Sequence, residues 1–174
     1  MDYLGHFSLR EEPFANAPLP RYYYASRQHT DALNRLLYAA RSMKGLAVLV
    51  GDIGRGKTTL ARRLLDLLPE DEFEAAMLVI VHAGITATWL LKRIAMQLGV
   101  PEPADDKLAI LSQLHQRLVE IHEDGKRAVV LIDEAQMRES RELMEEFRGL
   151  LNMKCPSTSS SRLSFLVCPS SSRT

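Results

Sequence analysis

Residues 46–59 read LAVLVGDIGRGKTT, and this stretch decides the fold. It opens with the apolar run LAVLV, which predicts a short buried strand at 46–50. The residues that follow fit the pattern G-x-x-x-x-G-K-[ST] at all four fixed positions, which are Gly51, Gly56, Lys57 and Thr58. The amphipathic segment from Thr58 to Leu68 then predicts a helix that Pro69 ends. A strand, a glycine-rich turn and a helix in this order predict a cradle for nucleotide phosphates.

The residue types in this turn suit phosphate chemistry better than a plain glycine turn without a ligand. Glycines let the loop wrap so that successive backbone N–H groups point at phosphate oxygens, and the helix adds its own N-terminal N–H groups. Lys57 would act catalytically by reaching the β- and γ-phosphates, and the Thr58 hydroxyl would hold Mg²⁺. Arg55 is expected to be solvated. The nucleotide-binding residues predicted here are Gly51, Asp52, Ile53, Gly54, Arg55, Gly56, Lys57, Thr58 and Thr59.

A second motif, VVLIDEAQ at 129–136, places two carboxylates after an apolar strand. Ligands of open α/β sheets bind at the carboxyl ends of the strands, so Asp133 is expected to bind Mg²⁺ through water. Glu134 would polarise the attacking water as the second catalytic residue. An acidic loop without a ligand is the alternative, but the phosphate loop makes the functional interpretation the expected one. The sequence contains no Asn-Lys-x-Asp guanine reader, which favours ATP over GTP.

The rest of the chain alternates between strand and helix patterns. Further strands are predicted at 74–81 and 128–132, and helical patterns cover residues 32–40, 89–98, 108–121 and 140–151. Strands that are apolar on both faces and alternate with helices predict an α/β fold, with a parallel sheet and helices on both of its faces. Trp89 is expected in the core.

Composition excludes several classes of protein. The formal net charge is zero, so nothing draws the whole molecule toward nucleic acid or an anionic membrane. The N-terminus lacks the continuous apolar core of a signal peptide, and no apolar run approaches the roughly 18 residues of a membrane span. Only two cysteines occur, Cys155 and Cys168, without metal-ligand spacing. A reducing, cytoplasmic setting is expected.

Tyrosines and histidines are weaker candidates for the site. Tyr22, Tyr23 and Tyr24 could wall an adenine pocket, although plain packing is favoured for each of them. The three histidines of the helical patterns are expected on the surface; these are His29, His115 and His122.

The motifs quoted above sit within a wider resemblance. The stretch YLGHFSLREEPF at 3–14, the phosphate loop, VVLIDEAQ and ELMEEFRGLLNM at 142–153 resemble the ATPase domain of ExeA/GspA-type proteins of general secretion and pilus biogenesis, members of the AAA+ class. The resemblance covers about residues 2–153. It implies a P-loop NTPase fold with sheet order 5-1-4-3-2, an ATP-driven homo-oligomer and an inner-membrane secretion partner. Transposition-regulator ATPases that act on DNA share this layout and are the alternative, which the neutral charge disfavours.

The end of the sequence departs from that family. Its polar sensor strand, helical lid and arginine finger are not recognisable, so we expect a sheet incomplete at the C-terminus and weak hydrolysis, with a catalytically silent fragment as a further alternative. We divide the chain into a Pro/aromatic segment 1–25, a partial AAA+ core 26–153 and an aberrant serine-rich tail 154–174. In one choice of codons, restoring a single base after the Met153 codon turns the tail into a reading with the apolar run LISFVFFG. A shifted reading frame is therefore our hypothesis for the tail, and RLSFLV at 162–167 is the candidate for the fourth strand.

Overall fold

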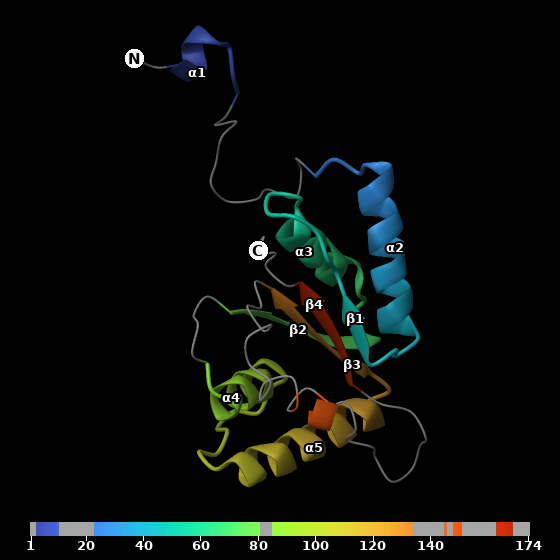
Figure 1. Cartoon of the computed structure of the whole chain (residues 1–174), viewed down its shortest axis with the longest axis vertical. Helices are drawn as coiled ribbons and strands as arrows, with labels where there is room; N and C mark the ends of the chain where they lie inside the picture. Colours follow the sequence, from blue (N-terminus) through green and yellow to red (C-terminus); the bar gives the residue numbers. More distant parts are fainter. Residues whose placement is uncertain are drawn as a thin grey trace.

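Four parallel strands form the sheet of this protein, whose computed structural model describes residues 3–10, 23–80, 85–133, 145, 148–150 and 163–168. The strands are β1 (Leu46–Val48), β2 (Phe73–Val79), β3 (Arg127–Asp133) and β4 (Leu163–Cys168). Their order across the sheet is β1-β4-β3-β2 (Figure 1). Helices lie on both faces, which confirms the predicted α/β fold class.

Strand β4 occupies the centre of the sheet, although it comes from the serine-rich segment that we expected to be aberrant. Phe165 pairs with Leu46 of β1 on one side and with Val130 of β3 on the other. Every residue of β4 is buried except the half-buried Val167. The position of RLSFLV between the phosphate-loop strand and the Asp133 strand agrees with the sheet order that the family resemblance implies. Strand β4 therefore fills the centre of the sheet, at the place of the fourth strand.

The helices of the described ranges are α1 (Tyr3–His6), α2 (Arg27–Arg41), α3 (Lys57–Leu67), α4 (Ala87–Gln97) and α5 (Lys107–Glu123). Three of them begin at a capping side chain. Ser26, Thr86 and Asp106 accept a backbone N–H bond at the starts of α2, α4 and α5, which satisfies one donor of each first turn. None of the helices in these described ranges is both long and apolar enough to cross a bilayer.

The predicted helix at 140–151 lies mostly outside the described residues. Residues 145 and 148–150 are helical, and Leu150 is buried as expected. Leu143 and Phe147, which we expected to point inward with it, are among the residues that the structure does not describe.

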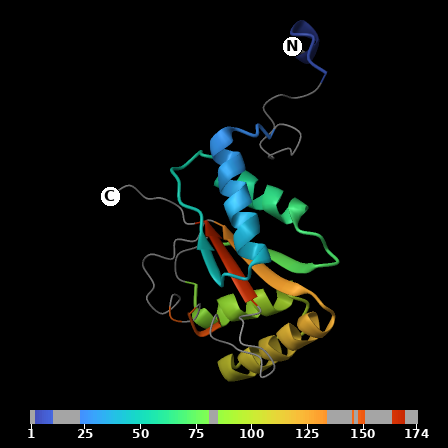
Figure 2. The same ribbon diagram turned by 90° about the vertical axis from the view of Figure 1, so that its right-hand side faces the viewer.

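Alternate residues of β3 divide the interior into two cores. Ala128, Val130 and Ile132 pack with α4 and α5, whereas Val129 and Leu131 pack with α2 and α3. The two helix pairs lie on opposite sides of the sheet when the molecule is turned (Figure 2). Because successive side chains of a strand point to opposite faces, an uninterrupted apolar strand is what a sheet covered on both faces requires.

Two burial predictions were wrong. The first strand was expected to be buried, but β1 is an edge strand whose Leu46 and Val48 are exposed, Val48 by 51%. Helices α4 and α5 do not cover that face at β1, so only Ala47 and Leu49 pack inward. Trp89 was expected in the core, but it is 43% exposed and lies beside Arg93 on α4. The buried stripe of α4 runs through Leu90, Leu91, Ile94 and Ala95 and leaves Trp89 at its border.

Replacing the central side chain of β4 tests whether this strand supports the fold. Phe165 is fully buried, so Phe165→Ala should lower the free energy of unfolding in urea by about 3–5 kcal/mol, because it leaves a cavity between β4 and α4/α5. The control Leu108→Ala removes a side chain that is 75% exposed and should change it by less than about 0.5 kcal/mol. Equal effects of the two substitutions would contradict a central β4.

Candidate functional site

The predicted phosphate loop connects β1 to α3 at the carboxyl edge of the sheet. Gly54 and Gly56 adopt φ values of +77° and +75°, a left-handed conformation that side chains other than glycine rarely tolerate. Gly56 is also the N-cap of α3, and no side chain caps this helix. The first-turn N–H groups of α3 are therefore left for a ligand, and a helix N-terminus favours a negatively charged one.

Lys57 lies inside the loop and is held by the loop itself. Its Nζ donates to the carbonyl oxygens of Gly51 at 2.7 Å and Asp52 at 3.0 Å. An ammonium group has three hydrogens, so these two bonds leave one for a phosphate oxygen. The predicted contact of Lys57 with nucleotide phosphates stays a prediction.

Asp133 is buried at the end of β3, with 1% of its surface exposed. Its Oδ2 has no hydrogen-bond partner among the described residues. The carboxylate lines a hollow of about 320 Å³, named here the Asp133 hollow, whose other lining residues are Ile53, Gly54, Gly56, Lys57, Thr58 and Cys168. Leaving a carboxylate oxygen buried without a partner is costly unless a cation or donor compensates it. Oxygen atoms of Asp133 and Thr58 beside one hollow are a donor set that fits Mg²⁺.

Cys168 is a neighbour of this site that the sequence did not indicate. It ends β4 and pairs with Asp133 across the ladder, so its thiol lines the same hollow. Burial and, after it, the negative charge of Asp133 raise the pKa of the Cys168 thiol, and Lys57 opposes both effects; together they bring this pKa to about 12. To predict Cys168 at the site from sequence, one would have to know that residues 163–168 pair with β3.

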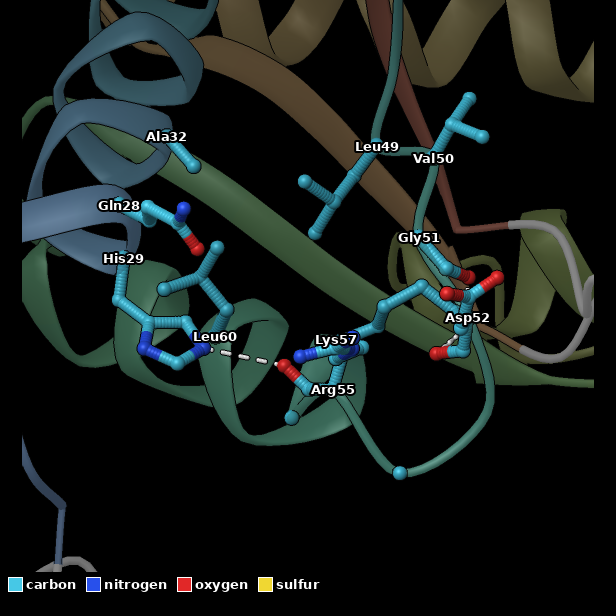
Figure 3. A pocket seen from close by; sticks show the side chains of 12 residues that line it. Gln28, His29, Ala32, Leu49, Val50, Gly51, Asp52, Arg55, Lys57 and Leu60 are labelled. Carbon is cyan, nitrogen blue, oxygen red and sulfur yellow. Dashed lines mark hydrogen bonds between the residues drawn. The ribbon is translucent and has the colours of Figure 1, made fainter. Parts of the chain in front are cut away.

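A wider hollow of about 650 Å³, named here the His29 hollow, opens between the start of α2 and the loop. Figure 3 shows the His29 ring directed at the Arg55 carbonyl, with a dashed line for the hydrogen bond between them. The remaining lining residues are Gln28, Ala32, Leu49, Val50, Gly51, Asp52, Gly54, Gly56 and Leu60. Nine loop residues were predicted to bind nucleotide, and all of them except Thr59 line one or both of the two hollows. Thr59 is half-buried in the first turn of α3.

Some predicted residues are not brought to the site. Tyr24 is exposed, and Tyr23 packs in the α2/α3 core instead of lining either hollow. Tyr22 and Glu134 lie outside the described residues. His122 is exposed and His115 half-buried on α5, whereas His29, also expected on the surface, is half-buried and bonded to the loop.

Comparison with known proteins supports this geometry. The family described as AAA domain matches residues 40–173. General secretion pathway protein A of Aeromonas hydrophila is 36% identical over 153 residues, which are 87% of this chain but only 27% of that protein. The Aeropyrum pernix ORC2 protein, solved as ADPNP and ADP complexes, superposes with a TM-score of 0.65 at 23% identity, over 90% of this chain and 44% of that one. Cdc6p from Pyrobaculum aerophilum gives a TM-score of 0.59 at 19% identity, over 88% and 42% respectively.

A parallel sheet that brings a phosphate loop and a buried strand-end aspartate to one edge defines a P-loop NTPase, and the matched family model assigns it to the AAA class. The chain belongs to the AAA domain family, which implies nucleotide binding together with a divalent metal ion. It spans about a quarter of the length of its secretion relative and less than half of the two structural neighbours.

The protonation of Cys168 predicts how the thiol reacts in the absence of Mg²⁺. The thiolate is the reactive form, and a rise in pKa from 9.0 to about 12 lowers the thiolate fraction at pH 8 by about 10³-fold. Iodoacetamide should therefore label Cys168 in the folded Cys155→Ser variant at least that much more slowly than in urea, as followed by mass spectrometry. Because the folded state favours the neutral thiol, Cys168 makes its full contribution to the free energy of unfolding below pH 9. This contribution is lost as the pH rises toward 12. Equal labelling of folded and unfolded chains would contradict a buried Cys168.

Proposed function

We propose that this chain binds Mg-ATP at the phosphate loop and is the nucleotide-binding domain of a secretion-type AAA ATPase. One observation carries the proposal: Lys57, Thr58 and the buried Asp133, whose Oδ2 has no hydrogen-bond partner in the described part of the chain, line the same hollow at the carboxyl edge of the sheet. An ammonium group, a hydroxyl and a carboxylate beside one hollow suit a metal–triphosphate complex.

Each group has a distinct part in this proposal. Backbone N–H groups at the start of α3 and the Lys57 ammonium would bind the phosphates, and Mg²⁺ held by Thr58 and, through water, by Asp133 would neutralise charge on them. Glu134 follows Asp133 directly in the sequence, and we propose that it polarises the attacking water.

The His29 hollow is our proposed position for the base and ribose. It lies on the α2 side of the loop and carries apolar side chains, among them Ala32, Leu49 and Leu60, suited to contact with a flat ring. Adenine is favoured over guanine because the sequence lacks an Asn-Lys-x-Asp reader.

The secretion assignment rests on the similarity to general secretion pathway protein A of Aeromonas hydrophila. By that similarity we propose that the protein works in the cytoplasm as a homo-oligomer, together with an inner-membrane secretion partner. A formal net charge of zero supports this role over DNA binding, which proteins achieve mainly with a surplus of Lys and Arg.

Loss of the loop lysine tests nucleotide binding. Lys57→Ala should weaken Mg-ATP binding, measured by calorimetry, by about tenfold or more, because a charge-assisted hydrogen bond contributes roughly 1.5–3 kcal/mol. Lys44→Ala is the matched control, since Lys44 is exposed and precedes β1, at the opposite end from the loop. Both variants should keep the thermal unfolding midpoint of the wild type. Equal affinity of Lys57→Ala and wild type would refute the proposed site.

Hydrolysis by the 174-residue chain alone should be slow. Counting the described residues, Lys57 is the one cation that lines the Asp133 hollow. An arginine directed at the transferring phosphate contributes about 10³–10⁵ in rate in related enzymes. We therefore expect steady-state turnover well below roughly 1 s⁻¹, where typical enzymes begin. Fast phosphate release that Glu134→Gln abolishes would show this expectation to be mistaken.

A further inference from the structure

His29 connects the first turn of α2 to the phosphate loop. Its Nε2 lies 3.0 Å from the carbonyl oxygen of Arg55, and its Nδ1 lies 2.7 Å from the Ser26 hydroxyl (Figure 3 shows the first of these bonds). Ser26 is itself fixed as the N-cap of α2, where its hydroxyl oxygen accepts the backbone N–H of His29 at 3.3 Å. The imidazole is therefore oriented from the helix and reaches across 26 residues of sequence to the loop.

The chemistry of these partners determines the tautomer of His29. A carbonyl oxygen only accepts hydrogen bonds, so the proton of the neutral ring must be on Nε2. Nδ1 then has no proton and accepts from the Ser26 hydroxyl. Ser26, His29 and Arg55 thus form a directed chain of hydrogen bonds that ends on the loop backbone.

That last bond orients one peptide of the loop. In a planar trans peptide the C=O and the following N–H point in opposite directions. Because the Arg55 carbonyl faces His29, the Gly56 N–H points away from it, and this N–H has no partner among the residues that the structure describes. The Arg55 carbonyl oxygen, which would repel a phosphate, is thus directed toward α2. The adjacent Gly56 N–H is left to donate to a ligand.

Lys57 also holds the loop by hydrogen bonds, but its ammonium group must change partners when a nucleotide binds. Lys57 Nζ donates to the carbonyls of Gly51 and Asp52, and the same ammonium is expected to contact the nucleotide phosphates. The His29 bond involves neither Lys57 nor the Gly56 N–H. It is therefore able to hold the loop in shape while Lys57 redistributes its hydrogen bonds.

We propose that His29 is a positioning residue of the nucleotide site. It holds the Arg55–Gly56 peptide so that the Gly56 N–H is aligned with a nucleotide phosphate, and it thereby couples the start of α2 to the loop. This inference rests on the proposed binding of Mg-ATP at the loop.

A pair of amide substitutions separates the loop bond from the other contacts of the ring. The glutamine amide nitrogen corresponds in reach to Nε2, whereas the asparagine amide corresponds to Nδ1 and stays near Ser26. His29→Gln should therefore keep the affinity for a fluorescent ATP analogue with Mg²⁺ within about twofold of wild type, and His29→Asn should lower it about three- to tenfold, as expected for one lost hydrogen bond. His115→Asn, the same substitution at a half-buried histidine of α5, is the matched control and should change nothing.

Nuclear magnetic resonance of the wild-type ring gives a readout that does not depend on a variant folding well. In the wild-type chain the ¹⁵N shifts of the His29 ring should report a proton on Nε2 and none on Nδ1, both without and with Mg-ATP. The carbonyl shift of Arg55 should move in His29→Asn and much less in His29→Gln. A proton on Nδ1 with none on Nε2, or a ring that leaves Arg55 when the nucleotide binds, would overturn the inference.

The outcomes for the two proposals are distinct. If wild type and all variants fail to bind the analogue, the proposed function fails. If wild type binds and His29→Asn binds equally well, or His29→Gln loses as much affinity as His29→Asn, the site stands and the positioning role of His29 is wrong.

Discussion

The pairing of β4 between β1 and β3 is the interaction on which the rest of this structure depends. Strand β1 carries the phosphate loop and β3 carries Asp133, but the two strands do not pair with each other. Only the ladders of β4, with Leu46 on one side and Val130 on the other, set the separation between loop and aspartate. The Asp133 hollow is the space that this spacing leaves at the carboxyl edge of the sheet.

The energetics of the site follow from its place at the end of a buried strand. Asp133 is carried into the interior by an apolar segment with helices on both faces, so water does not compensate its charge fully. Lys57 lines the same hollow, but its ammonium group is bonded to backbone carbonyls of the loop. A divalent metal with phosphate would satisfy both groups at once, because it supplies a cation to the carboxylate and anions to the ammonium.

Local sequence patterns predicted those parts of the structure that depend on neighbouring residues. The loop Gly51–Thr59 and the strand that ends at Asp133 lie where their motifs placed them, because strand, turn and helix signals act over a few residues. The exposure of Val48 was mispredicted because it depends on which helices reach the edge of the sheet, and that of Trp89 because the buried stripe of α4 ends beside it. His29 and Cys168 were missed as members of the site because each meets it through a contact distant in sequence. The proposed role of Glu134 remains a prediction, as this residue lies outside the described ranges.

The exposed face of β1 has a consequence for the behaviour of the chain in solution. An edge strand offers unpaired backbone groups, and here it also presents Leu46 and Val48, which none of the helices in the described ranges covers. Natural sheets protect such edges with charges, prolines or bulges, and none of these interrupts the run LAVLV. The isolated chain is thus a template for strand addition, and its tendency to self-associate should increase with concentration. A lysine in place of Val48 would weaken that tendency while leaving both hollows of the nucleotide site unchanged, since Val48 lines neither of them.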